Sequence, residues 1–145
     1  MRTLLIFPPQ AHFTQPYLAL PSLTAYLKAN GFPETRQWDM NLDSLEYFLS
    51  PSRLATSRTR IRERLDAFDT TRDLDLARMD EFKTLTEASV AADSVVGGID
   101  DALATLRDPN RFYDYGQYLR AVKRLDKAFK LISAEWYPTV LSPNS

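Results

Sequence analysis

Two short segments near the start of the chain have the pattern of strands. Residues 3–7, TLLIF, are almost continuously apolar and stop at Pro8, which is typical of a strand buried on both faces of a parallel sheet. Residues 33–41, PETRQWDMN, predict a second strand that ends near Asp39. The first forty residues therefore contain the two strands of a possible α/β unit.

Between these strands, leucines recur at the spacing of one helical face. Leu20, Leu23 and Leu27 lie three and four residues apart, and Gly31 is placed to end the helix as a C-cap. A strand, a helix and a second strand in this order make a βαβ unit, in which the two strands run parallel. We assign this unit to residues 1–50.

After residue 50 the apolar positions follow helical periods only. Long amphipathic helices are predicted over residues 51–68, 80–108 and 112–137, after a short helical piece at 43–50, and residues 138–145 form a turn-rich tail. The residues predicted on the buried stripes are Leu54, Ile61, Leu65 and Phe68, then Phe82, Leu85, Ala92, Val96, Ile99, Leu103 and Leu106, then Tyr115, Leu119, Val122, Phe129, Ile132 and Trp136. Gly97-Gly98 predicts a bend or a close helix contact inside the second long helix. The predicted fold class is an α/β start, one parallel βαβ unit, followed by a mostly α-helical region of about three long helices, so that helix dominates.

Composition removes several classes of function. The chain has 145 residues, of which 44% are hydrophobic and 26% charged, and its net charge is −1. That charge gives no field that would attract nucleic acid or an anionic membrane, so neither is expected as a partner. Apolar runs stay well short of the ~18 residues that span a bilayer, and the start lacks the core of a signal peptide. We therefore expect a cytoplasmic protein.

Cysteine is absent, and His12 is the single histidine. This chain therefore supplies no disulfide, no thiolate ligand for zinc or an iron–sulfur cluster, and no cysteine nucleophile. A site built from several histidines is excluded as well. We predict no catalytic residue and no metal site in this chain.

The opening segment resembles the amino-terminal part of cobalamin-binding radical SAM enzymes, a methyltransferase-like family. The resemblance rests on the order LLIFPP, PYLALPSLTAYLKANG and WDMN, and covers roughly residues 3–50. It implies a Rossmann-like domain that holds cobalamin beside a second domain with a cluster-binding cysteine motif. Because this chain lacks cysteine, the cluster and the radical chemistry would reside in a partner chain or in a missing C-terminal region. The chain is then a fragment, a split subunit or a shortened relative, and the helical stretch after residue 50 is similar to an insert carried by some branches.

The candidate cofactor site lies at the carboxyl ends of the strands, where ligands bind in open α/β sheets. Its predicted members are Pro9, Gln10, His12, Gln15, Tyr17, Asp39 and Asn41. Asp39 has a structural alternative, since an aspartate at this position can cap the following helix. His12 sits in QAHFTQ rather than in the DxHxxG motif that supplies a cobalt ligand in standalone cobalamin domains, so an ordinary loop histidine is the competing interpretation.

Two other patterns have structural explanations that we prefer. The arginines of SRTRIRERL, with Glu63 and Asp66 nearby, are typical of a solvated face whose charges pair with one another. The aromatic residues of RFYDYGQY favour helix packing over a stacking platform for bases. The alternative function is a helical protein–protein interaction module, or a self-associating subunit, without a cofactor.

Overall fold

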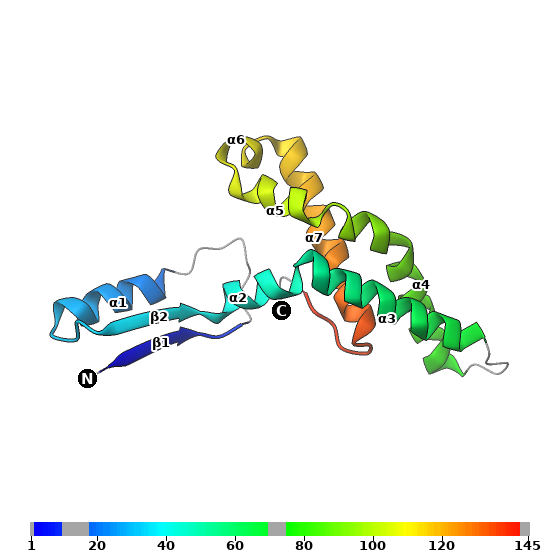
Figure 1. Cartoon of the computed structure of the whole chain (residues 1–145), viewed down its shortest axis with the longest axis horizontal. Helices are drawn as coiled ribbons and strands as arrows, with labels where there is room; N and C mark the ends of the chain where they lie inside the picture. Colours follow the sequence, from blue (N-terminus) through cyan, green and yellow to red (C-terminus); the bar gives the residue numbers. More distant parts are fainter. Residues whose placement is uncertain (1, 10–17, 70–74, 143–145) are drawn as a thin grey trace. The chain divides into compact units, whose positions relative to one another are not determined.

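A computed structural model describes residues 2–9, 18–69 and 75–142 (Figure 1). Within these residues the chain forms two strands and seven helices, so the predicted α/β start and mostly helical remainder are confirmed. The chain divides into two compact units. The first, here called the βαβ unit, runs to Tyr47, and the second, the helical unit, runs from Phe48 to Ser142.

The βαβ unit contains strand β1 (Thr3–Phe7), helix α1 (Ala19–Ala29) and strand β2 (Thr35–Asp39). Helix α2 (Met40–Phe48) begins directly after β2. The strands pair in parallel, and the register runs from Thr3 opposite Thr35 to Phe7 opposite Asp39. The parallel pairing that the sequence predicted is therefore confirmed.

Helix α1 covers only one face of the two-stranded sheet. Thr24 of α1 donates a hydrogen bond to Gln37 of β2 over 3.1 Å, which identifies the covered face. On the opposite face, Leu4 and Ile6 of β1 remain 53% and 48% exposed, and Trp38 of β2 remains 45% exposed. The prediction that β1 is buried on both faces is thus wrong for the described residues, because a single helix can cover only one side of a sheet.

Helix α1 packs against the sheet with a slightly different face from the one that the spacing of its leucines predicted. Leu20 and Thr24 are buried, whereas Leu23 is 52% exposed. Thr24 can face the sheet because its hydroxyl donates to the Leu20 carbonyl as well as to β2, which satisfies a buried polar group. The helix ends as predicted, since Gly31 has a φ of 92°, a left-handed conformation that favours glycine.

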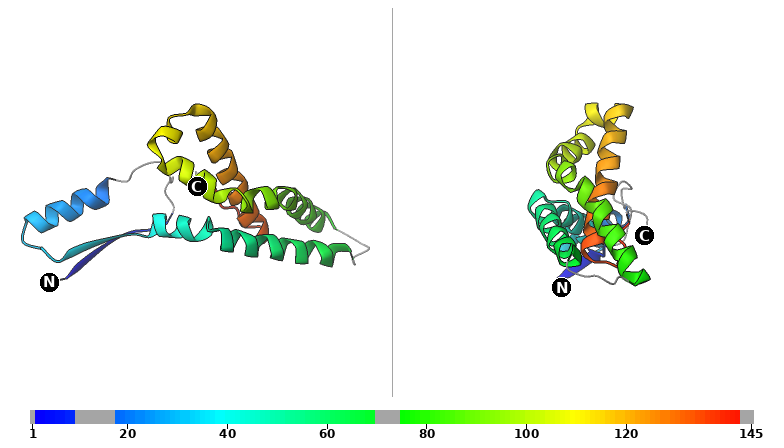
Figure 2. Two further views of the ribbon diagram at one scale, coloured as in Figure 1. Left: turned by 45° about the horizontal axis from the view of Figure 1, so that its top comes forward. Right: turned by 90° about the vertical axis from the view of Figure 1, so that its right-hand side faces the viewer.

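Among its described residues, the helical unit has three long and two short helices, which Figure 2 shows from two further sides. They are α3 (Pro51–Asp69), α4 (Leu76–Val96), α5 (Ile99–Arg107), α6 (Pro109–Phe112) and α7 (Tyr115–Glu135). Helices α3, α4 and α7 pack against one another, and α5 packs against α7. The largest fully buried hydrophobic side chains are Leu54, Ile61, Leu85, Val95, Ile99, Leu125, Leu131 and Ile132.

The predicted stripes are mostly correct in α3 and wrong at both ends of α7. Leu54, Ile61 and Phe68 are buried in α3, as expected. Tyr115 and Trp136, predicted at the two ends of the α7 stripe, are instead 76% and 53% exposed. Both lie outside the stretch from Ala121 to Glu135 that carries the buried residues of α7.

The glycine pair divides the second predicted helix into α4 and α5. A Cβ at Gly98 would overlap the guanidinium group of Arg124, which donates a hydrogen bond to the Gly98 carbonyl over 3.1 Å. The predicted bend and close helix contact are therefore confirmed. The absence of a side chain lets α7 approach the corner between α4 and α5.

The hydrophobic core belongs almost entirely to the helical unit. Leu20 is the only buried hydrophobic residue of the described βαβ unit, and the others all follow Phe48. Units this small are hard to stabilise even with a full core. The βαβ unit as described thus has the backbone of an α/β domain without its usual interior.

Candidate functional site

The parallel register brings the two segments that follow the strands to one edge of the sheet. Phe7 lies opposite Asp39, so Pro8 and Pro9 leave the sheet beside the start of α2. We call this place the carboxyl edge. It is the position where open α/β sheets bind ligands, and the parallel pairing of β1 and β2 brings the ends of both strands to it.

Of the seven predicted site residues, three lie within the described part of the chain. Pro9 is exposed, and Asp39 and Asn41 are half-buried. Gln10, His12, Gln15 and Tyr17 lie outside the described residues. Pro9 and Asn41 both follow the strand ends that meet at the carboxyl edge.

Asp39 has the structural role that was its alternative. Its Oδ1 accepts a hydrogen bond from the Leu42 amide over 3.0 Å, which caps the first turn of α2. Next to it, the indole N–H of Trp38 donates to Asp43 over 2.5 Å. These two bonds fix the turn from β2 into α2 and thereby position Asn41.

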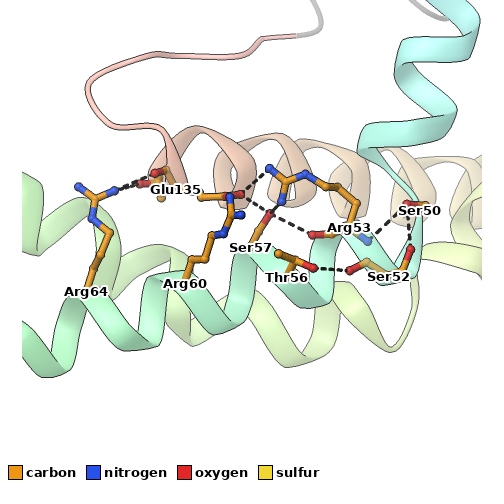
Figure 3. A network of polar contacts seen from close by, with 9 residues as sticks. Ser50, Ser52, Arg53, Thr56, Ser57, Arg60, Arg64 and Glu135 are labelled. Carbon is orange, nitrogen blue, oxygen red and sulfur yellow. Dashed lines mark hydrogen bonds and ion pairs between the residues drawn. The ribbon is translucent and has the colours of Figure 1, made fainter.

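A second polar site, the Glu135 cluster, joins the carboxyl end of α7 to α3 (Figure 3). We define it as Glu135 with Arg53, Ser57, Arg60 and Arg64. One carboxylate oxygen of Glu135 accepts from Arg53 at 2.8 Å and from Ser57 at 2.7 Å, and the other accepts from Arg60 at 2.6 Å. The side chains of Glu135 and Arg53 are 3% and 9% exposed, so this is a buried ion pair.

Electrostatics in the cluster favour the charged form of the carboxylate. Burial raises the pKa of Glu135, but hydrogen bonds from Ser57, Arg53 and Arg60 outweigh it and hold the pKa below its usual value of 4.5. Arg64 donates to the Ala134 and Glu135 carbonyls, which are among the groups that the end of α7 leaves without helical partners. The cluster therefore fastens α7 to α3.

A shallow hollow of about 320 Å³ lies beside this cluster, lined in part by Arg60, Arg64 and Trp136. Arg60 is bonded to Glu135, and Arg64 is bonded to Glu81 and to the carbonyls of α7. The cationic groups of the hollow thus already have partners within the protein. Their arrangement favours a structural clamp over an anion site.

Sequence reasoning missed the Glu135 cluster, although a signal for it exists. Glu135 follows Leu131 and Ile132 at helical spacing, which places a carboxylate on the buried face of α7. A charged residue on such a face is rarely buried without a partner. The sequence does not show which arginine supplies that partner.

The arginines of α3 are paired, as predicted, but with acids from other helices. Arg58 and Arg62 contact Asp93 of α4 at 2.9 Å each, and Arg64 contacts Glu81 of α4. The prediction that Glu63 and Asp66 share in this pairing is not supported by the ion pairs among the described residues. The reason is that α3 presents these arginines to α4 and α7, whose carboxylates lie closer than those on α3 itself.

An aromatic group lies around α6 and the start of α7. The ring of Phe112 meets those of Tyr113 and Tyr118 edge to face, with centroids 5.4 and 5.3 Å apart. Packing between neighbouring helices was the predicted role, and these contacts agree with it. Tyr113 and Tyr115 nevertheless remain 84% and 76% exposed.

No protein family, curated protein or solved structure matches this chain. Among the described residues, none of the helices is both long and apolar enough to cross a membrane, and no group of three or more ligand-type side chains could hold a metal ion.

Proposed function

We propose that the βαβ unit is the first part of a cobalamin-binding, Rossmann-like sheet of a radical SAM enzyme, and that it is not catalytic alone. The observation that carries the proposal is the register of β1 and β2, which puts both post-strand segments at the carboxyl edge. Support also comes from the motif order of residues 3–50, which is similar to the start of that enzyme family.

The contacts within the βαβ unit support a sheet completed by further strands. Sheets usually have four to six strands, and a ligand crevice needs neighbours on both sides of the switch point. The described sheet has two strands, and Leu20 of α1 is the one buried hydrophobic side chain of the described unit. The remaining strands, and the cluster-binding radical SAM core, would come from a partner chain or from a further region of the polypeptide.

The proposed contacts differ in kind along the carboxyl edge. Pro9 gives the chain a fixed exit from β1, and the amide of Asn41 can hydrogen-bond to the amide side chains at the rim of a corrin ring. Gln10, His12, Gln15 and Tyr17 are proposed as further contacts from the loop after β1. Asp39 acts by holding the start of α2. Bound cobalamin would supply a reactive cobalt–carbon bond, and this chain would position it.

Titration with hydroxocobalamin, followed by its visible spectrum, tests the proposal. We expect little or no binding by the 145-residue chain and clear binding by a longer polypeptide or by the complex with a partner. In that binding form, Asn41→Ala should weaken the affinity, whereas Asp93→Asn, in the helical unit, should leave it unchanged. Tight binding by the chain alone would refute the incomplete sheet, and no binding by any form would refute the cobalamin site.

The second candidate function is a protein–protein interaction module in the helical unit. Its support is the exposure of apolar and aromatic side chains on and beside the packed helices, with Leu76 at 85%, Val90 at 83% and Tyr113 at 84%. Tyrosine is enriched at the centres of interfaces. Light scattering that gives a strict monomer, together with no binding of an apolar dye, would count against this function.

A further inference from the structure

The hollow beside the Glu135 cluster has an aromatic wall that the clamp between α3 and α7 does not use. Trp136, the C-cap residue of α7, lines the hollow together with Arg60, Arg64 and the small side chain of Ala67. Trp136 is 53% exposed, and among the described residues no other aromatic ring and no guanidinium group stacks on its indole. The hollow therefore presents a large, flat apolar group that the described part of the protein leaves half exposed.

The two arginines of the hollow are held by bonds that leave their flat faces available. Arg60 donates to the Glu135 carboxylate over 2.6 Å, and Arg64 donates to the Glu135 carbonyl over 2.8 Å and to the carboxylate of Glu81. Hydrogen bonds to a guanidinium group lie in its plane, so its two faces can still stack on an aromatic ring. The side chains of Arg60 and Arg64 are 53% and 34% exposed, so a ligand can reach them. Because their positions are already fixed, binding costs little ordering of these long side chains.

Charge and size narrow the class of ligand. In the lining of the hollow, Arg60 and Arg64 are balanced by Glu63 and Glu135, so no net charge attracts an anion or a cation. The volume of about 320 Å³ lies at the lower end of the range of about 300–1,000 Å³ that small-molecule sites span. The hollow is therefore suited to an uncharged group the size of one ring or two fused rings.

On this basis we infer that the hollow binds an uncharged, planar aromatic ring system, stacked on Trp136 and on the guanidinium faces of Arg60 and Arg64. Contacts between aromatic rings and contacts between a guanidinium group and a ring both favour a flat aromatic ligand over an aliphatic one. The site lies wholly in the helical unit. It goes beyond the proposed function, because it requires neither cobalamin nor further strands of the βαβ unit.

Fluorine NMR of the full chain labelled with 5-fluorotryptophan tests the inference. The chain has two tryptophans, and Trp38, which is 45% exposed in the βαβ unit, is an internal control for Trp136. The spectrum of Trp38→Phe assigns the two signals. Titration with indole should move the Trp136 signal in a saturable manner and leave the Trp38 signal in place. Benzoate, a charged ring, and cyclohexanol, an uncharged ring that is not flat, should compete poorly with indole.

Two matched variants keep the test specific. Arg60→Lys retains a positive charge beside Glu135 but removes the flat guanidinium group, so indole should bind about threefold more weakly. Arg58→Lys, on the same helix but paired with Asp93 of α4, should leave the affinity for indole unchanged. Circular dichroism shows whether both variants keep the fold. An unmoved Trp136 signal, equal shifts of both tryptophan signals, competition by benzoate or cyclohexanol as strong as that by indole, or equal affinities of the two variants would overturn the inference.

A ring of this kind can belong to a free compound or to an aromatic side chain of another protein. N-acetyltryptophanamide separates the two sources, because it is uncharged and carries the indole ring between two peptide groups. Binding at least as tight as that of indole would support a site for a side chain. Weaker binding than that of indole would support a site for a free compound.

Discussion

Glu135→Gln should be among the most damaging single substitutions in the helical unit. The change preserves the shape of the side chain and removes its charge. Arg53, whose side chain is 9% exposed, would then stay buried without a carboxylate. Breaking a buried ion pair from one side costs about 3–5 kcal/mol, because the remaining charge is left uncompensated.

The expected loss of unfolding free energy is a large part of the stability of a typical domain, which is about 5–15 kcal/mol. Loss of the ion pair with Arg60 adds about 0.2–1 kcal/mol to this cost, because the side chain of Arg60 is 53% exposed and exposed pairs contribute little. For a unit of about 100 residues, each kcal/mol lowers the melting temperature by roughly 4–8 °C. We therefore expect the variant to melt on the order of 15 °C or more below the wild type.

Urea unfolding followed by far-ultraviolet circular dichroism measures the effect. Asp93→Asn is the matched control, because Asp93 also pairs with two arginines but its side chain is 67% exposed. We expect it to cost less than about 1 kcal/mol. The double variant Arg53→Met with Glu135→Leu should recover much of the stability, since a buried pair can often be replaced by apolar residues. Similar losses for Glu135→Gln and Asp93→Asn would refute the reasoning.

The same variant tests the pH dependence of the cluster. The pKa of Glu135 is lower in the folded state than its ordinary value of 4.5, so its contribution is complete above that pH and is lost as the pH falls through the lowered value. The wild type should therefore lose stability in acid more steeply than Glu135→Gln. Parallel acid profiles of the two proteins would contradict the shift.

Substitutions at three further positions test local features. Gly98→Ala should destabilise the helical unit by about 1 kcal/mol or more in a urea titration, because Arg124 must leave its hydrogen bond to make room. Gly116→Ala, in the first turn of α7 and at ordinary contact distance from its neighbours, should instead stabilise it slightly, by less than about 0.5 kcal/mol. Asp39→Ala should speed amide hydrogen exchange at Leu42, whereas Asp39→Asn, which can still cap, should not; equal exchange in both variants would refute the capping role.

Local patterns predicted much of the fold correctly. The stop at Pro8, the glycine at position 31 and the pair Gly97-Gly98 each act on the backbone within a few residues, so they mark the ends of elements wherever those elements pack. Capping by Asp39 is local in the same sense. The positions of Gln10, His12, Gln15 and Tyr17 stay predictions, because those residues lie outside the described ranges.

The sequence by itself determined which sides of the helices are apolar and that a parallel βαβ unit begins the chain, because both follow from spacing along a single segment. Only the tertiary structure decided what those sides face. Glu135 meets Arg53 and Ser57 across more than seventy positions. Among the described residues, no helix covers the exposed Leu4 and Ile6, whereas α4 and α7 pack against the helix that carries the buried Ile61. Periodicity records the direction in which a side chain points, and its environment depends on segments that are distant in sequence.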